Sequence, residues 1–387
     1  MIPRPSAKAR VRELFREHPC VAILGPRQCG KTTLARLLGA EEPECTFFDL
    51  ESPLDARKLS APMRTLGALG GLVVLDEIQR NPSLFEILRV LVDRPGSETR
   101  FLILGSASPD LIKGASESLA GRLGFVDLGG FDIEETGGDS QDRLWSRGGF
   151  PRSFLAADEA GSLHWRQGFV RTFLERDIPQ LGMSVPAETL RRFWTMIAHF
   201  HGQVWNGAEF ARSLGSSEGT ARRYLDLLAG AYMVRILPPW FENLSKRQVK
   251  APKIYIRDSG LLHALLELRT LADLSAHPKL GASWEGFALE QVLALLGSRS
   301  AYFWATHGGA ELDLMVIAGG RRYGFEFKVS EAPGTTRSMR VALADLGLEH
   351  LWIVYPGDDA YELDERLSVL PLRNVPGLWD RAGRTRG

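Results

Sequence analysis

Eight residues near the N-terminus, Gly25-Pro-Arg-Gln-Cys-Gly-Lys-Thr32, constrain the fold of this chain more than any other segment. An apolar run typical of a buried strand, residues 20–24, precedes them, and a helical pattern, residues 33–38, follows. In the order strand, G-x-x-x-x-G-K-T, helix, the loop N–H groups converge on phosphate oxygens. The sequence therefore predicts ATP binding with Mg²⁺ as cofactor, through Gly25, Pro26, Arg27, Gln28, Cys29, Gly30, Lys31, Thr32 and Thr33.

Specific roles follow for two residues of this loop and for a carboxylate pair farther along the chain. Lys31 is expected to reach the outer phosphates, and the Thr32 hydroxyl to ligate Mg²⁺. A second apolar run, residues 72–75, ends in Asp76 and Glu77. We expect Asp76 at the metal and Glu77 at the attacking water, which makes the site hydrolytic. Alternatively, the pair only caps a helix that begins near Ser83.

Three more apolar runs, residues 46–48, 101–104 and 125–128, predict further strands. The region up to Gly138 is therefore expected to be an open α/β sheet with ligands at the strand C-termini. Ser106 follows one of these strands and is a candidate contact of the γ-phosphate or the water. Arg122 is a candidate catalytic charge for the transferred phosphoryl group, in its own subunit or in a neighbouring one, or else a helix cap.

These motifs resemble those of prokaryotic AAA-type ATPases. The resemblance is carried by residues 25–34, Leu75-Asp-Glu-Ile-Gln79, Leu104-Gly-Ser106 and Ser118-Leu-Ala-Gly-Arg122. Cys29 departs from the small aliphatic residue common in that family, a change that should not disturb phosphate binding by the backbone. Residues 243–265 resemble the accessory region of the same family, so the resemblance covers nearly the whole chain. It implies ATP binding and hydrolysis.

Length and charge limit what the rest of the chain can be. A chain of 387 residues is expected to fold as two or three domains. Its 47 basic and 47 acidic residues create no overall field that favours nucleic acid, so any DNA contact must come from local patches. The N-terminus does not have the pattern of a signal peptide, and the apolar runs are too short for a membrane span. We expect a cytoplasmic protein without a membrane partner.

The middle third, residues 139–250, is expected to be helical and similar to a winged helix. Residues 208–214 and 218–228 predict a helix-turn-helix around Gly215-Ser-Ser217, followed by a strand at 233–237. Arg222 and Arg223 then face DNA, or the module only packs against protein. A basic run is a second candidate for phosphate contacts, unless it is an ordinary solvated surface: Lys246, Arg247, Lys250, Lys253 and Arg257.

The C-terminal third, residues 251–387, has the order helix, three strands, helix, strand, from residue 284 to 355. In the strand 322–329 a two-residue repeat puts Glu326 and Lys328 on one face. Asp313 precedes the Gly319-Gly320 turn and is expected beside Glu326. Glu285 lies on an inward helical stripe, where a glutamate needs a partner.

These four residues resemble the D…E-x-K signature of the PD-(D/E)xK nuclease superfamily, and the element order matches restriction-endonuclease-like folds. Glu285, Asp313 and Glu326 are the expected metal ligands, and Lys328 the residue that activates water or stabilises the phosphate. An exposed salt-bridge pattern is the alternative, and cleavage of nucleic acid stays open.

Two functions are compatible with this sequence. The first is an ATPase of three domains, 1–138, 139–250 and 251–387, that couples its nucleotide state to a DNA-related or nuclease-like module. The second is an ATP-dependent switch that acts through protein contacts, with a non-catalytic C-terminal domain. A homo-oligomer or a protein partner is open in both.

Overall fold

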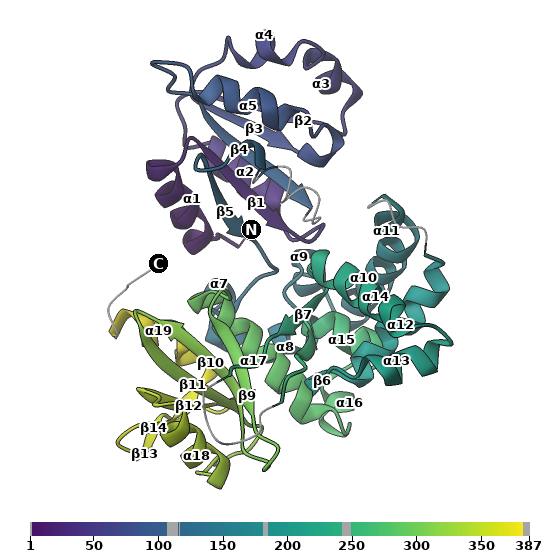
Figure 1. Cartoon of the computed structure of the whole chain (residues 1–387), viewed down its shortest axis with the longest axis vertical. Coiled ribbons are helices and arrows are strands. Elements are labelled where there is room, and N and C mark those ends of the chain that lie inside the picture. Colours follow the sequence, from purple (N-terminus) through teal and green to yellow (C-terminus); the bar gives the residue numbers. More distant parts are fainter. Residues whose placement is uncertain (1, 107–114, 116, 181–184, 242–248, 382–387) are drawn as a thin grey trace. The chain divides into compact units, whose positions relative to one another are not determined.

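The five apolar runs predicted as strands form one parallel sheet in the computed structural model, which confirms the α/β expectation for this region (Figure 1). The strand order is β2-β3-β4-β1-β5, and every neighbouring pair is parallel. The strand C-termini therefore lie at one edge of the sheet. The strands are β1 (Cys20–Gly25), β2 (Cys45–Asp49), β3 (Leu72–Asp76), β4 (Arg100–Ser106) and β5 (Leu123–Asp127).

The structure describes residues 2–106, 115, 117–180, 185–241 and 249–381. They divide into two compact units. Unit 1 comprises Met1–Gly130 with Gly230–Tyr232, and unit 2 comprises Phe131–Ala229 with Met233–Gly387. The expected division into three domains stays a prediction.

Helices cover the sheet of unit 1 because their apolar residues recur on one side. In α5 (Leu84–Val92) Leu84, Leu88 and Leu91 are buried and belong to the same core as Ala22 of β1. The remaining helical elements are α1 (Pro5–Glu17), α2 (Lys31–Gly39), α3 (Pro53–Lys58), α4 (Pro62–Leu66) and η1 (Ile78–Arg80).

The first part of unit 2 is mainly helical, as predicted. It contains α7 (Ile133–Thr136), η2 (Gly138–Ser140), α8 (Gln141–Arg147), α9 (Pro151–Phe154), α10 (Glu159–Thr172), η3 (Phe173–Asp177), α11 (Ile178–Gln180) and α12 (Ala187–His199).

The predicted helix-turn-helix segments are two helices, α13 (Gly207–Leu214) and α14 (Glu218–Gly230). Gly215 ends α13 with φ +63°, a backbone conformation that glycine adopts readily. Three short strands pair beside them in the order β6-β8-β7. They are β6 (Gln203–Val204), β7 (Val234–Leu237) and β8 (Lys253–Ile256). Strand β8 follows the boundary expected at residue 250, yet it pairs with two strands that precede that boundary.

The C-terminal part has the element order expected from the sequence, and its sheet is longer than expected. The six-stranded mixed sheet has the order β13-β14-β12-β11-β10-β9. Its strands are β9 (Ala301–Ala305), β10 (Glu311–Ala318), β11 (Arg321–Phe327), β12 (His350–Tyr355), β13 (Tyr361–Asp364) and β14 (Leu367–Pro371). The last two strands were not predicted. The helical elements are α15 (Ser259–Leu265), α16 (Leu271–Ser275), α17 (Leu280–Leu296), α18 (Arg337–Asp345), η4 (Leu372–Asn374) and α19 (Val375–Arg381).

The hairpin between β10 and β11 sets the register of Asp313 and Glu326, two of the predicted metal ligands. Ala318 pairs with Arg321, and the two turn residues, Gly319 and Gly320, have φ +56° and +77°. Positive φ at both positions is the requirement of a tight two-residue hairpin turn. With Leu314 paired to Phe325, this register places Asp313 beside Glu326.

The segment after β7 covers the edge strand β9 of the large sheet. Trp240 N donates to Phe303 O at 2.7 Å, and Phe303 N donates to Pro238 O at 3.0 Å. The Trp240 and Tyr302 rings pack edge to face with centroids 4.9 Å apart. These contacts satisfy backbone groups that an open sheet edge leaves unpaired.

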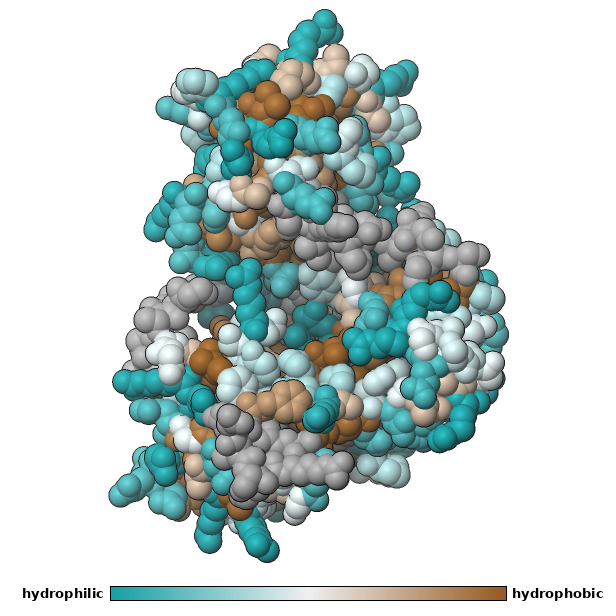
Figure 2. Space-filling view, viewed as in Figure 1, coloured by the Kyte–Doolittle hydropathy of each residue, from teal (hydrophilic) through white to brown (hydrophobic). Residues whose placement is uncertain are grey.

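Most of the visible face is hydrophilic, with smaller hydrophobic patches (Figure 2). Among the residues that the structure describes, no helix combines the length and the apolar character needed to cross a membrane.

Replacement of Gly260 by alanine should destabilise unit 2 by about 1–3 kcal/mol, because a Cβ there would overpack the α8–α15 contact. That Cβ would lie 2.1 Å from Arg147 O. The matched control is Gly168→Ala in α10, where a Cβ meets nothing within 4 Å; it should stabilise by about 0.5–1 kcal/mol. All nine tryptophans follow residue 130, so urea denaturation monitored by tryptophan fluorescence reports on unit 2. Equal stability of the two variants would contradict the packing described here.

Candidate functional site

The loop between β1 and α2 has a backbone that only glycine permits at two points. A Cβ at Gly25 would lie 2.0 Å from Leu128 O, and Gly30 has φ +102°. Gln28, inside the loop, also has positive φ, +63°. Backbone amides in such a loop at a helix N-terminus form a concave site for phosphate oxygens. The loop therefore has the form that binding of ATP phosphates requires.

Lys31 and Thr32 begin α2 and turn toward the strand ends. The buried Lys31 ammonium donates to Gly25 O at 2.9 Å and to Pro26 O at 2.8 Å. The Thr32 hydroxyl donates to Asp76 Oδ2 at 2.7 Å. Burial raises the pKa of Asp76, while this hydrogen bond lowers it. A hydroxyl and a carboxylate side by side are the oxygen ligands that suit Mg²⁺, so Thr32 and Asp76 fit the predicted metal.

Glu77 directly follows β3 in a left-handed conformation, φ +57° and ψ +46°. Its backbone N–H donates to Asp76 Oδ1 at 3.0 Å. The Gln79 side chain donates to the Glu77 carboxylate and orients it. An orienting role for Gln79 was not predicted, although a polar residue two positions after the carboxylate expected at the attacking water is the available signal.

The two remaining catalytic candidates of unit 1 differ in outcome. The backbone of Ser106 pairs with Gly25, at the edge where the loop begins, but the Ser106 side chain lies outside the described residues.

Arg122 precedes β5, whose first residue, Leu123, pairs with Cys20 at the start of β1. At about 3.3 Å per residue, five strand residues separate Arg122 from the loop edge by roughly 16 Å.

The alternative in which Arg122 acts at the phosphate loop of its own chain is therefore wrong. Its guanidinium instead forms a bidentate ion pair with Asp93, with distances of 2.6 and 2.9 Å. This pair lowers the pKa of the exposed Asp93 carboxyl through the hydrogen bonds to Arg122. Action on a neighbouring subunit stays a prediction.

Arg4 forms hydrogen bonds that support the phosphate loop, a role that the sequence did not predict. Its buried guanidinium donates to Cys29 O at 3.1 Å, to Gly129 O at 3.2 Å and to Gly130 O at 2.8 Å. Arg4 therefore ties the loop to the end of the β5 segment. No sequence motif predicts this role of Arg4, because its partners are backbone carbonyls distant in sequence.

In unit 2, Glu285, Asp313, Glu326 and Lys328 converge as predicted. Lys328 Nζ lies 2.7 Å from Glu326 Oε2 and 3.7 Å from Asp313 Oδ2. Asp313 Oδ2 also accepts from Phe327 N at 3.1 Å. Asp313 and Glu326 are both buried, so the alternative of an exposed salt-bridge pattern does not apply to them.

Lys253 of β8 lies among the same carboxylates, which corrects its assignment to a phosphate-binding surface. Lys253 Nζ is 3.1 Å from Glu285 Oε1, 3.6 Å from Asp313 Oδ1 and 2.5 Å from Glu311 Oε1. Tyr255 donates its hydroxyl proton to Glu285 Oε1 at 2.7 Å. Neither Lys253, Glu311 nor Tyr255 was predicted as part of this cluster.

The metal prediction for this cluster also differs from the structure. Across the described ranges, no group of three or more His, Cys, Asp and Glu side chains is arranged to hold a metal ion. The Lys253 ammonium lies between Glu285 and Asp313, at the position expected for the metal ion. The observed arrangement is thus an ion-pair network in which Glu311 and Lys328 are partly exposed and the other members are largely buried. It contains four carboxylates and two lysines: Glu285, Glu311, Asp313, Glu326, Lys253 and Lys328.

Burial and neighbouring charges shift several protonation equilibria here. Burial, with Asp313 alongside, raises the pKa of Glu326 to about 8. Burial also raises the pKa of Glu285, against the opposite effect of Lys253. For Lys253, burial lowers the pKa, but Tyr255 and the surrounding carboxylates outweigh it and raise the pKa well above the ordinary value.

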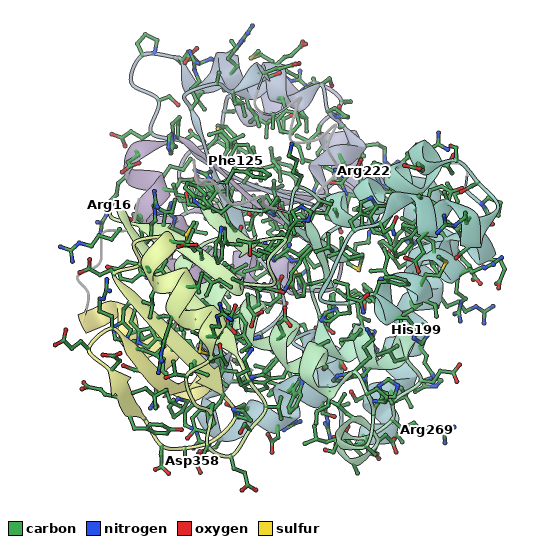
Figure 3. All side chains as sticks on the ribbon, turned by 60° about the horizontal axis from the view of Figure 1, so that its bottom comes forward. Arg16, Phe125, His199, Arg222, Arg269 and Asp358 are labelled. Carbon is green, nitrogen blue, oxygen red and sulfur yellow. The ribbon has the colours of Figure 1, made fainter. Side chains whose placement is uncertain are left out.

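The predicted DNA-contacting residues are partly dispersed. Arg222 and Arg223 are exposed on α14, where Arg222 pairs with Asp226 at 2.9 Å. Arg222 is labelled in Figure 3. Of the basic run, Lys250 is exposed, Arg257 pairs with Glu290 at 3.2 Å and Lys253 is buried. Lys246 and Arg247 lie outside the described residues. A continuous basic strip is therefore not formed by the described members of this run.

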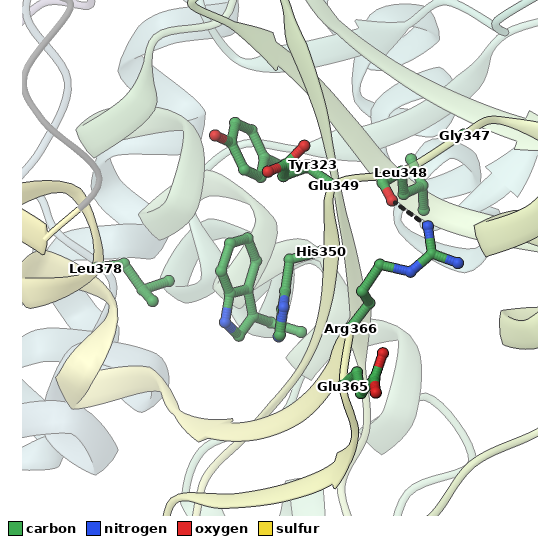
Figure 4. A pocket seen from close by; sticks show the side chains of 9 residues that line it. Tyr323, Gly347, Leu348, Glu349, His350, Glu365, Arg366 and Leu378 are labelled. Carbon is green, nitrogen blue, oxygen red and sulfur yellow. Dashed lines mark hydrogen bonds between the residues drawn. The ribbon is translucent and has the colours of Figure 1, made fainter.

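A separate pocket of about 620 Å³ lies on the large sheet of unit 2 (Figure 4). Tyr323, His350 and Trp352 line it, with the Tyr323 and Trp352 rings stacked at a centroid distance of 5.8 Å. The pocket contains none of the residues predicted as functional.

Three segments of the chain match known protein families. Residues 17–137 match an AAA domain, residues 138–272 a domain of unknown function (DUF8612), and residues 280–375 another domain of unknown function (DUF4143). The first match confirms the resemblance of the N-terminal third to AAA-type P-loop ATPases.

The whole chain is similar to two mycobacterial proteins. The uncharacterized proteins Rv2008c of Mycobacterium tuberculosis and Mb2031c of Mycobacterium bovis are each 55% identical to it over 375 residues, which is 97% of this chain and 85% of each relative. Among solved structures, the Walker-type ATPase PABY2304 of Pyrococcus abyssi is 14% identical with a TM-score of 0.49, covering 69% of this chain and 96% of its own.

Arg122→Ala should leave ATP affinity unchanged, because Arg122 lies at the opposite edge of the sheet from the phosphate loop. Lys31→Ala should weaken it by about a hundredfold, since the variant has no ammonium to donate a charge-assisted hydrogen bond to phosphate. Titration with a fluorescent ATP analogue at low protein concentration, which limits association between chains, measures both. Equal reductions of affinity in the two variants would contradict the position assigned to Arg122.

Proposed function

Because this chain belongs to the same protein family as the mycobacterial proteins Rv2008c and Mb2031c, and its N-terminal third is an AAA domain, we propose that it is a Mg²⁺-dependent ATPase. Its nucleotide state is coupled to a DNA-related module in unit 2. The observation that carries the ATPase proposal is the 2.7 Å hydrogen bond from Thr32 to Asp76, which joins the phosphate loop to the β3 end.

Each residue at this edge has a separate task in the proposed reaction. The loop N–H groups and Lys31 bind phosphate oxygens, and Lys31 exchanges its present carbonyl partners for them. Thr32 and Asp76 would hold Mg²⁺, which would supply positive charge to the phosphates when bound. Glu77, oriented by Gln79, accepts a hydrogen bond from the attacking water and takes its proton.

The order of elements in the middle of the chain supports a winged-helix module. Helix α12, strand β6, helices α13 and α14, and strands β7 and β8 follow one another, and the sheet order is β6-β8-β7. In helix-turn-helix proteins the second helix enters the DNA groove. Here that helix is α14, and it exposes Arg222 and Arg223.

For the C-terminal part, the convergence of Asp313, Glu326 and Lys328 and the order of its elements support a nuclease-like fold. A second candidate function is an ATP-dependent switch that acts through protein contacts and has a non-catalytic C-terminal domain. The observation that favours it is Lys253, whose ammonium lies at the centre of the acidic cluster.

Glu77→Gln should slow ATP hydrolysis by about a hundredfold or more while ATP affinity is kept, because the change removes only the base at the water. The control is Glu86→Gln on α5, an exposed glutamate of the same unit, which should hydrolyse ATP at the parent rate. Steady-state phosphate release with and without EDTA measures both. Unchanged turnover of the Glu77 variant would refute its role.

The chain should bind duplex DNA at low salt, and its affinity should fall steeply as salt is added, because lysine and arginine displace counterions from the DNA phosphates. The double variant Arg222→Ala/Arg223→Ala should bind more weakly, and its salt slope should be smaller by about one for each arginine that touches a phosphate. Arg171→Ala is the control, since Arg171 forms the same kind of exposed helical pair, with Glu175 at 3.1 Å. Fluorescence anisotropy at several salt concentrations measures binding; no binding at low salt would favour the switch.

A further inference from the structure

The acidic cluster of unit 2 contains more negative charge than a protein interior tolerates without compensation. Glu285, Asp313 and Glu326 come from α17, β10 and β11, and Glu311 adds a fourth carboxylate from β10. Buried carboxylates require a bound cation or a paired base, since desolvation costs several kcal/mol per charge. The chain supplies the cations itself, through Lys253 and Lys328.

The Lys253 ammonium lies where a divalent cation would have to bind. It contacts Glu285 Oε1 at 3.1 Å and Asp313 Oδ1 at 3.6 Å, and these carboxylates are two of the three predicted metal ligands. Mg²⁺ binds oxygen at about 2.0–2.1 Å, so an ion held by the same oxygens would occupy nearly the same space. The two positive charges would also repel each other. Lys253 and a metal at this position therefore exclude one another.

Lys253 is held firmly in place from outside the cluster. Backbone pairing on both sides fixes it, since Lys253 lies opposite Val204 of β6 and Leu237 of β7. Its ammonium is 5.7 Å from the centroid of the Phe303 ring, and its side chain is only 5% exposed. Two residues on, Tyr255 faces the same way and donates to Glu285.

We propose that Lys253 is the resident cation of this acidic centre, closing it to divalent metal ions and joining the three-stranded sheet to the nuclease-like sheet. The centre thus connects these two sheets of unit 2 without a metal ion. This inference rests on the proposed nuclease-like arrangement and is independent of ATP hydrolysis.

Mn²⁺ binding to the full chain without nucleotide tests the inference. The parent for all measurements carries Asp76→Asn, so that the nucleotide site adds no signal. Electron paramagnetic resonance should show no Mn²⁺ bound at the acidic centre of this parent. Lys253→Met, which removes the charge and shortens the side chain by one atom, should gain one Mn²⁺ equivalent that the parent lacks.

The melting temperature supplies a second readout and a matched control. Lys253→Met should melt at a lower temperature than the parent in EDTA, and Mn²⁺ should restore much of the difference. Lys250→Met, which changes an exposed lysine three residues earlier, should behave like the parent in both respects. Lys253→Arg, which keeps the positive charge, should bind no Mn²⁺.

Three results would overturn the proposal. One is Mn²⁺ binding by the parent that disappears on Glu285→Gln. Another is a folded Lys253→Met chain without Mn²⁺ binding. The third is Mn²⁺-dependent DNA nicking by the parent that Asp313→Asn abolishes. If Lys253→Met does not fold, the parent and Lys253→Arg decide: absence of Mn²⁺ binding in both supports the proposal, and binding in either overturns it.

Discussion

The candidate nucleotide site depends on a geometric constraint: parallel strands that share a sheet end at the same edge. Strand β4 separates β1 from β3, and both of these strands end at this edge. The Thr32 hydroxyl and the Asp76 carboxylate, 44 positions apart in sequence, therefore lie within 2.7 Å of each other. The same constraint excludes Arg122, which precedes its strand and lies at the other edge. Function in unit 1 therefore follows from which end of a strand a residue occupies, and Arg4 and Gln79 then hold the loop and the carboxylate in place.

Compensation of buried negative charge is the corresponding constraint in unit 2. Burial of several carboxylates around Asp313 is tolerated only with cations beside them, and two lysines provide these. Lys328 directly follows β11, in the hairpin that carries Asp313 and Glu326, whereas Lys253 comes from a different sheet. The ion-pair network therefore connects two modules, and this connection is the physical basis for treating residues on either side of position 250 as one compact unit.

One error of sequence interpretation came from using proximity along the chain in place of proximity in space. Lys253 was grouped with Lys250 and Arg257 because they are close in sequence. The alternation Lys253-Ile-Tyr-Ile256 was the available signal of a buried strand, in which lysine and tyrosine share one face. Strand β13 was missed because Tyr361–Asp364 is mostly exposed and polar and lacks the apolar pattern of a core strand. Strand β14, Leu367–Pro371, is mostly buried and apolar, so its signal was present in the sequence and was overlooked.

The sequence by itself determined the elements whose signals are local. The phosphate loop, the five apolar strands and the β10–β11 hairpin depend on glycine positions and on the alternation of apolar residues, which short segments already specify. It also determined that Asp313, Glu326 and Lys328 would meet, since a two-residue turn sets that register. Only the tertiary structure decided which strands are neighbours and which cation enters the acidic centre. Strand order and packing between modules join residues far apart in sequence, and no local pattern encodes them.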